Sequence, residues 1–338
     1  MDECWFDSDT EGAVRSLPRG VVAANVRAAI DSISTNTHMS VLVVGTTALD
    51  SIKTPKAENP RLLGGSASHA AVAASFFAPT KLLGVVGGDF PAKYIKLYEK
   101  HGICLKGLER VKEGQTFHWS GEYEVNMNNR RTLNTVLGVI ENWSPKLPGD
   151  YETTPYVLLA NIAPPIQHSV LDQLCRPKFV IADTMDLWMN IMLPDLLKLL
   201  KRVDAFVLNE SEASQLTKED NLFTALKKIH QLGPRYVIIK KGSHGAILSG
   251  PKGFFIAPAY PLKKVVDPTG AGDSFVGGMI GYLAGAKGDI EKNLRRAIIH
   301  GTVTASFCCE GFGVVATTKA TRQAIDLRVK ELEALARF

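Results

Sequence analysis

The sequence predicts an α/β protein built on a mostly parallel sheet with helices on its faces. From Ser40 onward, short apolar runs typical of buried strands alternate with segments of helical periodicity. At 338 residues the chain is long enough for one large domain with a small appendage. Hydrophobic residues make up 45% of the chain and charged residues 22%, which is the composition of an ordinary globular protein.

The expected strands are apolar runs, and the expected helices are periodic segments between them. Strands are expected at residues 41–45, 82–86, 156–160, 179–182, 205–208 and 237–240. Helices are expected at residues 67–77, 91–101, 191–200 and 222–232. Ser66 is the expected N-cap of the first helix, and Pro91 suits the first turn of the second.

Two segments interrupt this rhythm. Residues 51–63 are polar and contain prolines, and residues 116–139 read as extended strands with a turn at 126–129. The second segment alternates in polarity through Phe117, Trp119, Gly121, Tyr123 and Val125. We expect a small inserted β element, from segments of about 50–64 and 106–140. It would serve as a lid that excludes water from a site, or as a solvent-facing hairpin or oligomer contact.

The charge and the cysteines exclude several classes of protein. The 39 basic and 34 acidic residues give a net charge of +5, and the basic residues form no long block, so no nucleic-acid partner is expected. No apolar stretch reaches the roughly 18 residues of a membrane helix, so no membrane partner is expected. Five cysteines with no C-x-x-C pair indicate a reducing cytoplasm.

The first 38 residues differ from the rest of the chain. They begin with a polar, acidic stretch that lacks the apolar run of a signal peptide. Met39 directly precedes the first expected strand. We therefore interpret residues 1–38 as an N-terminal extension of unknown role and residues 39–338 as the folded domain.

The most informative segment is Asp-Pro-Thr-Gly-Ala-Gly-Asp-Ser-Phe at residues 267–275, here called the signature turn. An apolar helical pattern follows it at once. The start of a helix carries unpaired N–H donors and a partial positive charge, so it is a natural anion site. Asp273 falls in the first turn, where a carboxylate can take a proton from an attacking hydroxyl. The alternative is an acidic residue that only complements the helix dipole.

Two common phosphate-binding motifs are absent from the sequence. The chain contains no G-x-x-x-x-G-K-[ST] run, which excludes a Walker P-loop. Phe275 stands where a dinucleotide-binding fingerprint needs its third glycine. The signature turn is therefore neither of these loops.

Three features in order identify a family resemblance. Gly64-Gly65, the N-x-x-E element from Asn209 to Glu212 and the signature turn together resemble the ribokinase-like (PfkB) carbohydrate and nucleoside kinases. The match runs from Ser40 to about Thr318. The resemblance implies a ribokinase-like central sheet flanked by helices, with a β lid. It also implies transfer of the γ-phosphoryl group of ATP to a hydroxyl, usually of a primary alcohol.

The resemblance also implies roles around the transfer centre. Asp273 would be the catalytic base, and the backbone of Gly270, Ala271 and Gly272 would form the anion hole. The family uses N-x-x-E to hold Mg²⁺, largely through water. Glu212 suits that role, although a helix start with acidic residues is the alternative reading.

On the nucleotide side, the resemblance points to two loops and an ion site. Lys240, Gly242 and Gly245 lie in a loop like the family's nucleotide loop, where many members have threonine in place of the lysine. Lys240 would meet ATP phosphate or be a solvated loop lysine. Phe312 and Gly313 resemble the loop over the adenine, with core packing as the alternative for Phe312. Some relatives bind a monovalent cation through residues equivalent to Asp267 and Thr269, so K⁺ activation is a further expectation.

On the acceptor side, Asp50 matches the acidic residue that binds sugar hydroxyls, and Gly64 and Gly65 would let the backbone approach the sugar. His69 stands where many relatives have asparagine, and it would touch the substrate or pack in its helix. Met185 and Leu187 replace the asparagine and arginine of many sugar kinases, which weakens a fructokinase or ketogluconate kinase reading. The predicted sugar site has no cluster of arginine or lysine residues nearby, so a sugar that already carries a phosphate is not expected as the acceptor.

The sequence thus predicts an ATP- and Mg²⁺-dependent kinase that acts on a primary hydroxyl of a sugar. An adenosine or other nucleoside kinase is the alternative, because Phe117, Trp119 and Tyr123 would stack on a base. A non-catalytic relative that binds a sugar or nucleotide is a third possibility, and the retained Asp273 counts against it. Relatives often pair through their lids, so a homodimer is expected from the resemblance.

Overall fold

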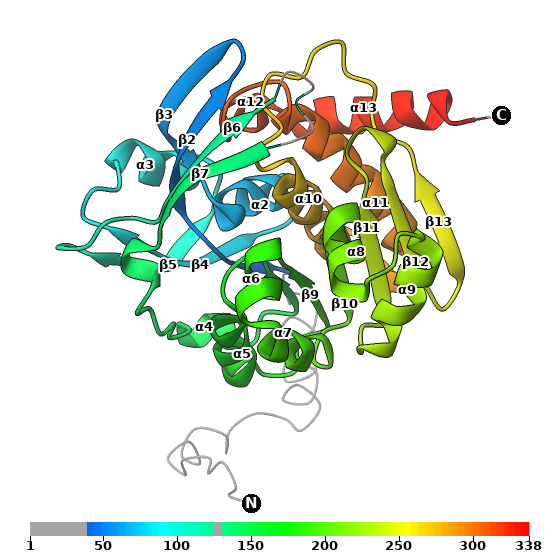
Figure 1. Cartoon of the computed structure of the whole chain (residues 1–338), viewed down its shortest axis with the longest axis horizontal. Helices are drawn as coiled ribbons and strands as arrows, with labels where there is room; N and C mark the ends of the chain where they lie inside the picture. The colour runs from blue at the N-terminus through cyan, green and yellow to red at the C-terminus, as the bar shows by residue number, and fades with distance from the viewer. Residues whose placement is uncertain (1–38, 125–126, 128–129, 338) are drawn as a thin grey trace, which may run out of the picture. The chain divides into compact units, whose positions relative to one another are not determined.

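The structure, a computed structural model, describes residues 39–337 except 125–126 and 128–129 (Figure 1). The expected N-terminal extension, Val125 and most of the expected turn at 126–129 lie outside this part. Within the described residues, two sheets are formed: a large one of nine strands and a small one of four.

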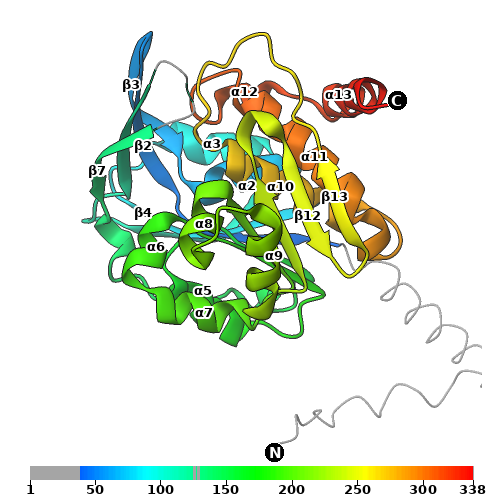
Figure 2. The same cartoon turned by 45° about the vertical axis from the view of Figure 1, so that its right-hand side comes forward.

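The large sheet is mostly parallel, as predicted. Its strands follow the order β13-β12-β11-β10-β9-β8-β1-β4-β5. Only the β11-β12-β13 end is antiparallel, and β12 and β13 are labelled side by side in Figure 2. The strands are β1 (Val41–Val44), β4 (Thr80–Gly87), β5 (Cys104–Val111), β8 (Tyr156–Leu159), β9 (Phe179–Asp183), β10 (Ala205–Asn209), β11 (Tyr236–Lys240), β12 (Ala246–Gly250) and β13 (Gly253–Ala257). All six expected strands are present, while β5, β12 and β13 were not predicted.

Helices cover both faces of the large sheet (Figures 1 and 2). One face carries α2 (Ser66–Ser75), α3 (Ala92–Lys100), α10 (Ala271–Gly285) and α11 (Ile290–Cys308). The other carries α5 (Pro164–Gln173), α6 (Asp186–Ile191), α7 (Leu193–Leu200), α8 (Glu210–Thr217) and α9 (Leu222–Gln231). Alternate residues of each strand enter the two cores: Val41 and Val43 face the first, and Leu42 and Val44 the second.

The remaining elements are short or peripheral. They are α4 (Gly149–Glu152), α12 (Val315–Lys319), α13 (Arg322–Leu335) and two 3₁₀ turns, η1 (Gly138–Ile140) and η2 (Gly242–His244). The helix expected at 191–200 begins at Leu193, after α6.

The expected N-cap at Ser66 is wrong. Gly65 occupies that position with a φ of 87°, and Ser66 is the first helical residue. The Ser66 hydroxyl instead donates to the carbonyl of Asn161 at 2.8 Å and accepts the amide of Thr46 at 3.1 Å. Its side chain therefore joins the start of α2 to the loop after β8 and cannot cap the helix.

The interrupting segments form the small sheet, whose order is β3-β2-β6-β7. Its strands are β2 (Ala48–Thr54), β3 (Ala57–Gly64), β6 (His118–Tyr123) and β7 (Arg130–Val136). The β2–β3 and β6–β7 pairs are antiparallel hairpins, and β2 pairs with β6 in parallel. Residues 106–111 belong to β5 of the large sheet, so the second segment joins the small sheet only from His118.

Candidate active site

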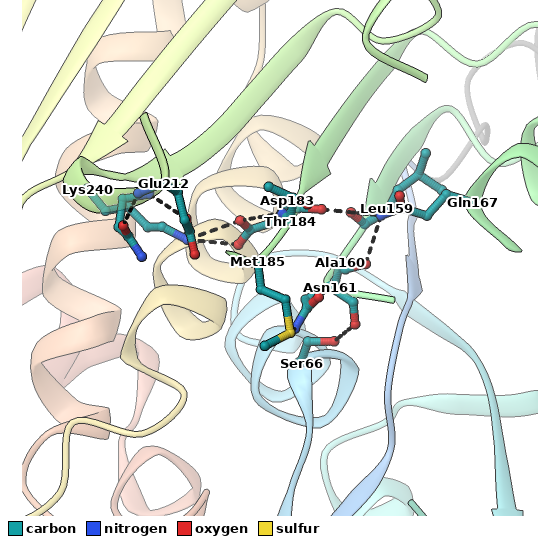
Figure 3. A network of polar contacts seen from close by, with 11 residues as sticks. Ser66, Leu159, Ala160, Asn161, Gln167, Asp183, Thr184, Met185, Glu212 and Lys240 are labelled. Atoms are coloured by element: carbon teal, nitrogen blue, oxygen red, sulfur yellow. Dashed lines mark hydrogen bonds and ion pairs between the residues drawn. The ribbon is translucent and has the colours of Figure 1, made fainter. Parts of the chain in front are cut away.

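Polar side chains gather where the parallel strands of the large sheet end (Figure 3). Asp183 is the last residue of β9, Asn209 of β10 and Lys240 of β11, and Asn161 follows β8 by two residues. Ligands of open α/β sheets collect at this edge. The signature turn and the start of α10 lie beside it, because a Cβ at Gly272 would be 3.2 Å from the Lys240 Nζ atom.

The signature turn presents backbone donors at the start of α10. Gly270 is the N-cap, with a φ of 76°, and a Cβ there would lie 2.3 Å from the ring of His69. Only glycine fits both the conformation and the space. The amide of Ala271 donates to the carbonyl of Pro268 at 3.1 Å, which removes it from the expected anion hole. Across the described residues, the amides of Gly270 and Gly272 have no backbone partner, so these two remain for an anion.

Asp273 lies in the first turn of α10, with an intermediate exposure. Its charge acts on both Lys240 and Asp183. This carboxylate therefore stands at the edge where the strands end, beside the two glycine amides.

Lys240 forms a buried ion pair with Asp183 (Figure 3). Its Nζ atom is 2.9 Å from Oδ2 and 3.2 Å from Oδ1 of the carboxylate. Burial opposes the charge of Lys240, but the carboxylates around it hold its pKa above the ordinary value. They belong to Asp183, Glu212 and Asp273. The alternative of a solvated loop lysine is wrong, because only 18% of the side chain is exposed.

Asn209 and Glu212 form a capping box at the start of α8. The side chain of Asn209 accepts the amide of Glu212 at 2.9 Å, and Oε2 of Glu212 accepts the amide of Asn209 at 2.7 Å. The helix-start reading of this element is therefore correct as a description of its contacts. A capped carboxylate still fits a Mg²⁺ site reached through water, because the cap uses one of about four acceptor positions.

Asp267 ties the signature turn to the loop after α11. It is fully buried, and its two oxygens accept the amides of Thr269 at 2.9 Å and Gly313 at 3.3 Å. Burial raises the pKa of Asp267, and these amide bonds act in the opposite direction. The Thr269 hydroxyl donates to the hydroxyl of Tyr123 at 3.0 Å. Both residues of the expected K⁺ site thus have structural contacts of their own.

A cavity of about 990 Å³ opens beside the signature turn. Of the residues expected on the nucleotide side, Lys240, Gly242, Gly245 and Phe312 line it, and Asn209 does not. Gly313 does not line the cavity; it is buried, and its amide donates to Asp267. Further lining residues come from the tip of the β2–β3 hairpin and from the loop before the signature turn: Thr54, Pro55, Lys56, Ala57, Tyr260, Pro261, Leu262 and Lys264.

The acceptor-side residues divide into two groups. Asp50, Gly64 and Gly65 meet: Oδ2 of Asp50 accepts the amide of Gly65 at 3.2 Å, and a Cβ at Gly64 would overlap that carboxylate. His69, by contrast, is 1% exposed and packs beneath Gly270, so its position matches the packing alternative. Burial lowers the pKa of His69 to about 4. Its Nδ1 atom lies 3.6 Å from the Cys308 sulfur.

Several site residues were missed in the sequence. The indole of Trp188 donates to Oδ1 of Asn161 at 2.7 Å. The Asn161 amide contacts the sulfur of Met185 at 3.1 Å (Figure 3). Asp183 is a further residue of the site that the sequence analysis does not single out, although Met185 and Leu187 lie just after it. The available signal was position, since Asn161 and Asp183 come at or just after the end of a parallel strand.

Comparison with known proteins agrees with this architecture. A family model described as "pfkB family carbohydrate kinase" matches residues 39–321. A cytidine kinase of Thermococcus kodakarensis is 27% identical, over 73% of this chain and 90% of its own.

Two solved structures share the fold. A nucleoside kinase of Methanocaldococcus jannaschii superposes with a TM-score of 0.71 at 22% identity, covering 87% of this chain and 98% of its own. The Arabidopsis thaliana ribokinase, solved with ribose and ATP, has a TM-score of 0.70 at 23% identity, covering 86% and 98%. Within the described residues, no helix is long and apolar enough to span a membrane. The chain belongs to the pfkB family of carbohydrate kinases and is a phosphotransferase acting on a sugar or nucleoside hydroxyl.

Proposed function

We propose that the protein transfers the γ-phosphoryl group of ATP to a primary hydroxyl of a sugar. The observation that carries the proposal is the grouping of Asp273, two glycine amides and Lys240 at one edge of the sheet, beside a cavity of about 990 Å³. A base, anion donors and a cation are the parts that phosphoryl transfer requires.

In this proposal Asp273 accepts the proton of the attacking hydroxyl as its oxygen bonds to the γ-phosphorus. The bond from that phosphorus to the bridging oxygen of ADP breaks, and the proton passes from Asp273 to solvent. The amides of Gly270 and Gly272 and the ammonium of Lys240 stabilise the charge of the transferred group. A positioned base contributes a factor of about 10²–10⁴.

The nucleotide occupies the large cavity, with Phe312 in its wall beside the base and the Gly242–Gly245 turn on the same side. Glu212 would hold Mg²⁺ through water, and the metal would neutralise phosphate charge. Asp267 and Thr269 stay the expected residues of a K⁺ site. The small sheet acts as a lid, because the tip of its β2–β3 hairpin lines the nucleotide cavity.

On the acceptor side, Asp50 binds sugar hydroxyls while Gly64 and Gly65 bring the backbone close. A nucleoside is the second candidate. It is supported by the cytidine kinase that matches over 90% of its own length. Of the aromatic residues expected to stack on a base, Trp119 remains a half-buried candidate. Tyr123 is 6% exposed, and Phe117 packs against the core.

Two further expectations concern the whole molecule. The four cysteines in the described ranges are free, which supports a reducing cytoplasmic location. Strands β3 and β7 are the edges of the small sheet, which supports a homodimer formed through the lid.

The experiment is an ADP-release assay with ATP and Mg²⁺ across ribose, fructose, other free sugars and the common nucleosides. A free sugar with the highest kcat/KM supports the proposal, and a nucleoside with the highest kcat/KM replaces it with the second candidate. If the folded protein binds ATP but releases no ADP with any of these compounds, the result supports the non-catalytic relative instead. Asp273→Asn must lose nearly all of any ADP release that the parent shows.

A further inference from the structure

The Asp183–Lys240 pair bridges two strands that are not neighbours. Asp183 ends β9 and Lys240 ends β11, with β10 between them. The ammonium reaches across the end of β10 to the carboxylate at 2.9 Å. The same ammonium borders Gly272, where an added Cβ would lie 3.2 Å away. Lys240 is therefore held between Asp183 and the start of α10.

Asp183 is itself fixed from two directions (Figure 3). Its Oδ1 atom accepts the amide of Thr184 at 2.9 Å. Its backbone carbonyl accepts the side-chain amide of Gln167 at 3.3 Å, and the same amide donates to the carbonyls of Leu159 and Ala160 at 3.2 and 3.1 Å. Gln167 is 1% exposed and joins the ends of β8 and β9. The carboxylate therefore has little freedom to move with the lysine.

Such a pair is a weak source of stability, because burying two charges costs about as much as their attraction returns. Its position suggests another use. Lys240 also interacts electrostatically with the carboxylates of Glu212 and Asp273. Without Asp183, the lysine would be free to pair with Asp273, which is the base of the proposed reaction.

We propose that Asp183 is a positioning residue that directs Lys240 toward the transferred phosphoryl group and away from Asp273. The inference rests on the proposed function. Lysine has three N–H donors, and two of them face the oxygens of Asp183 at 2.9 and 3.2 Å. The third is left for a phosphate oxygen at the glycine amides. A fixed cation there stabilises charge without reorganising during transfer.

The first test compares Asp183→Asn, Lys240→Met and the double variant in steady-state ADP release. Asparagine keeps an oxygen for the Thr184 amide, so the fold is preserved. We expect Lys240→Met to lower kcat by about 10²–10³, as for loss of an oxyanion donor. We expect Asp183→Asn to lower kcat at least tenfold, with the KM for ATP within about threefold, because the lost factor belongs to the transition state.

The double variant is the decisive comparison. If Asp183 acts through Lys240, the kcat of the double variant must match that of Lys240→Met alone, because the effects of residues that act as a unit are not additive. The inference is overturned if the double variant loses the product of the two single fold losses in kcat. It is also overturned if Asp183→Asn keeps a kcat within twofold of the parent. Asp204→Asn and Lys81→Met are matched controls expected to keep the parent kcat. Asp204→Asn removes the charge of a half-buried carboxylate that accepts the Val180 amide. Lys81→Met removes a half-buried ammonium that donates to the Thr154 hydroxyl.

The second test needs no turnover. Calorimetry with Mg²⁺ measures the affinity for ADP with and without aluminium fluoride, which mimics the transferred group. The parent should bind ADP more tightly with the fluoride, and Asp183→Asn and Lys240→Met should lose most of that gain while their affinity for ADP alone is kept. An equal gain in all three proteins overturns the inference while the proposed function stands. A parent that neither binds ADP nor releases it refutes the proposed function itself, and the inference falls with it.

Discussion

The hydroxyl of Thr269, in the signature turn, donates a 3.0 Å hydrogen bond to the hydroxyl of Tyr123, in strand β6 of the small sheet. Both side chains are buried, with 7% and 6% exposure. The amide of Thr269 is held by Asp267, and its carbonyl accepts from the Cys308 sulfur at 3.3 Å. One residue of the signature turn thus joins the small sheet, the turn itself and the end of α11.

Tyr123→Phe should therefore slow turnover by up to about tenfold, since one hydrogen bond contributes about 0.5–1.5 kcal/mol. The physical reason is that the small sheet loses its bond to the turn that carries Asp273. Steady-state ADP release gives kcat, and urea unfolding gives the stability. Tyr98→Phe is the matched control: it removes a buried hydroxyl of α3 that pairs with Ser68 of α2 at 2.7 Å. It should lose stability and keep kcat. Equal kcat in both variants would contradict the prediction.

The parallel part of the fold was predictable because strands buried on both faces are continuous apolar runs. Strands β8 and β9 are fully buried and were found within one residue of their bounds. Strand β3 was expected only as part of the inserted β element at about 50–64, without bounds of its own, because it lies at the edge of the small sheet with most of its side chains partly or fully exposed. Strand β13 was missed for the same reason.

The site was predictable where a short segment carries its own geometry, as in the glycine run of the signature turn. It was not predictable where contacts depend on strand order. The Asp183–Lys240 pair requires β9, β10 and β11 to lie side by side, which the sequence does not state. His69 was ambiguous because its role depends on which side of α2 faces α10, and the structure turns it toward Gly270.

Asp273→Asn should lose nearly all ADP release, because a general base contributes a factor of about 10²–10⁴. Asparagine has the same shape and can still complement the start of α10, so the protein should fold. Thermal unfolding and ADP binding by calorimetry provide the check on folding. A variant that keeps more than about a tenth of the parent rate would remove Asp273 from the role of base.

Glu212→Ala should raise the Mg²⁺ concentration required for half-maximal rate, because it removes a carboxylate that suits a water-mediated metal site. It should also cost about 1 kcal/mol of stability, since the capping box loses its bond to the Asn209 amide. Glu212→Gln separates the two effects, because its amide oxygen can keep the cap while the charge is lost. Metal titrations that match the parent in both variants would exclude the metal role and leave only the cap.

His69 should make the protein sensitive to acid. Its folded pKa of about 4 lies below the ordinary 6.5, so the fold favours the neutral ring. The stability is complete above the unfolded pKa and is lost as the pH falls from 6.5 toward 4, by about 2 kcal/mol between pH 7.5 and pH 5. Urea unfolding at these two pH values should show this loss in the parent and in the exposed His244→Gln control. In His69→Gln the loss of unfolding free energy between the two pH values should be smaller by about 2 kcal/mol. The buried His300 contributes equally to all three proteins. An unchanged pH dependence in His69→Gln would show that the ring is not held neutral.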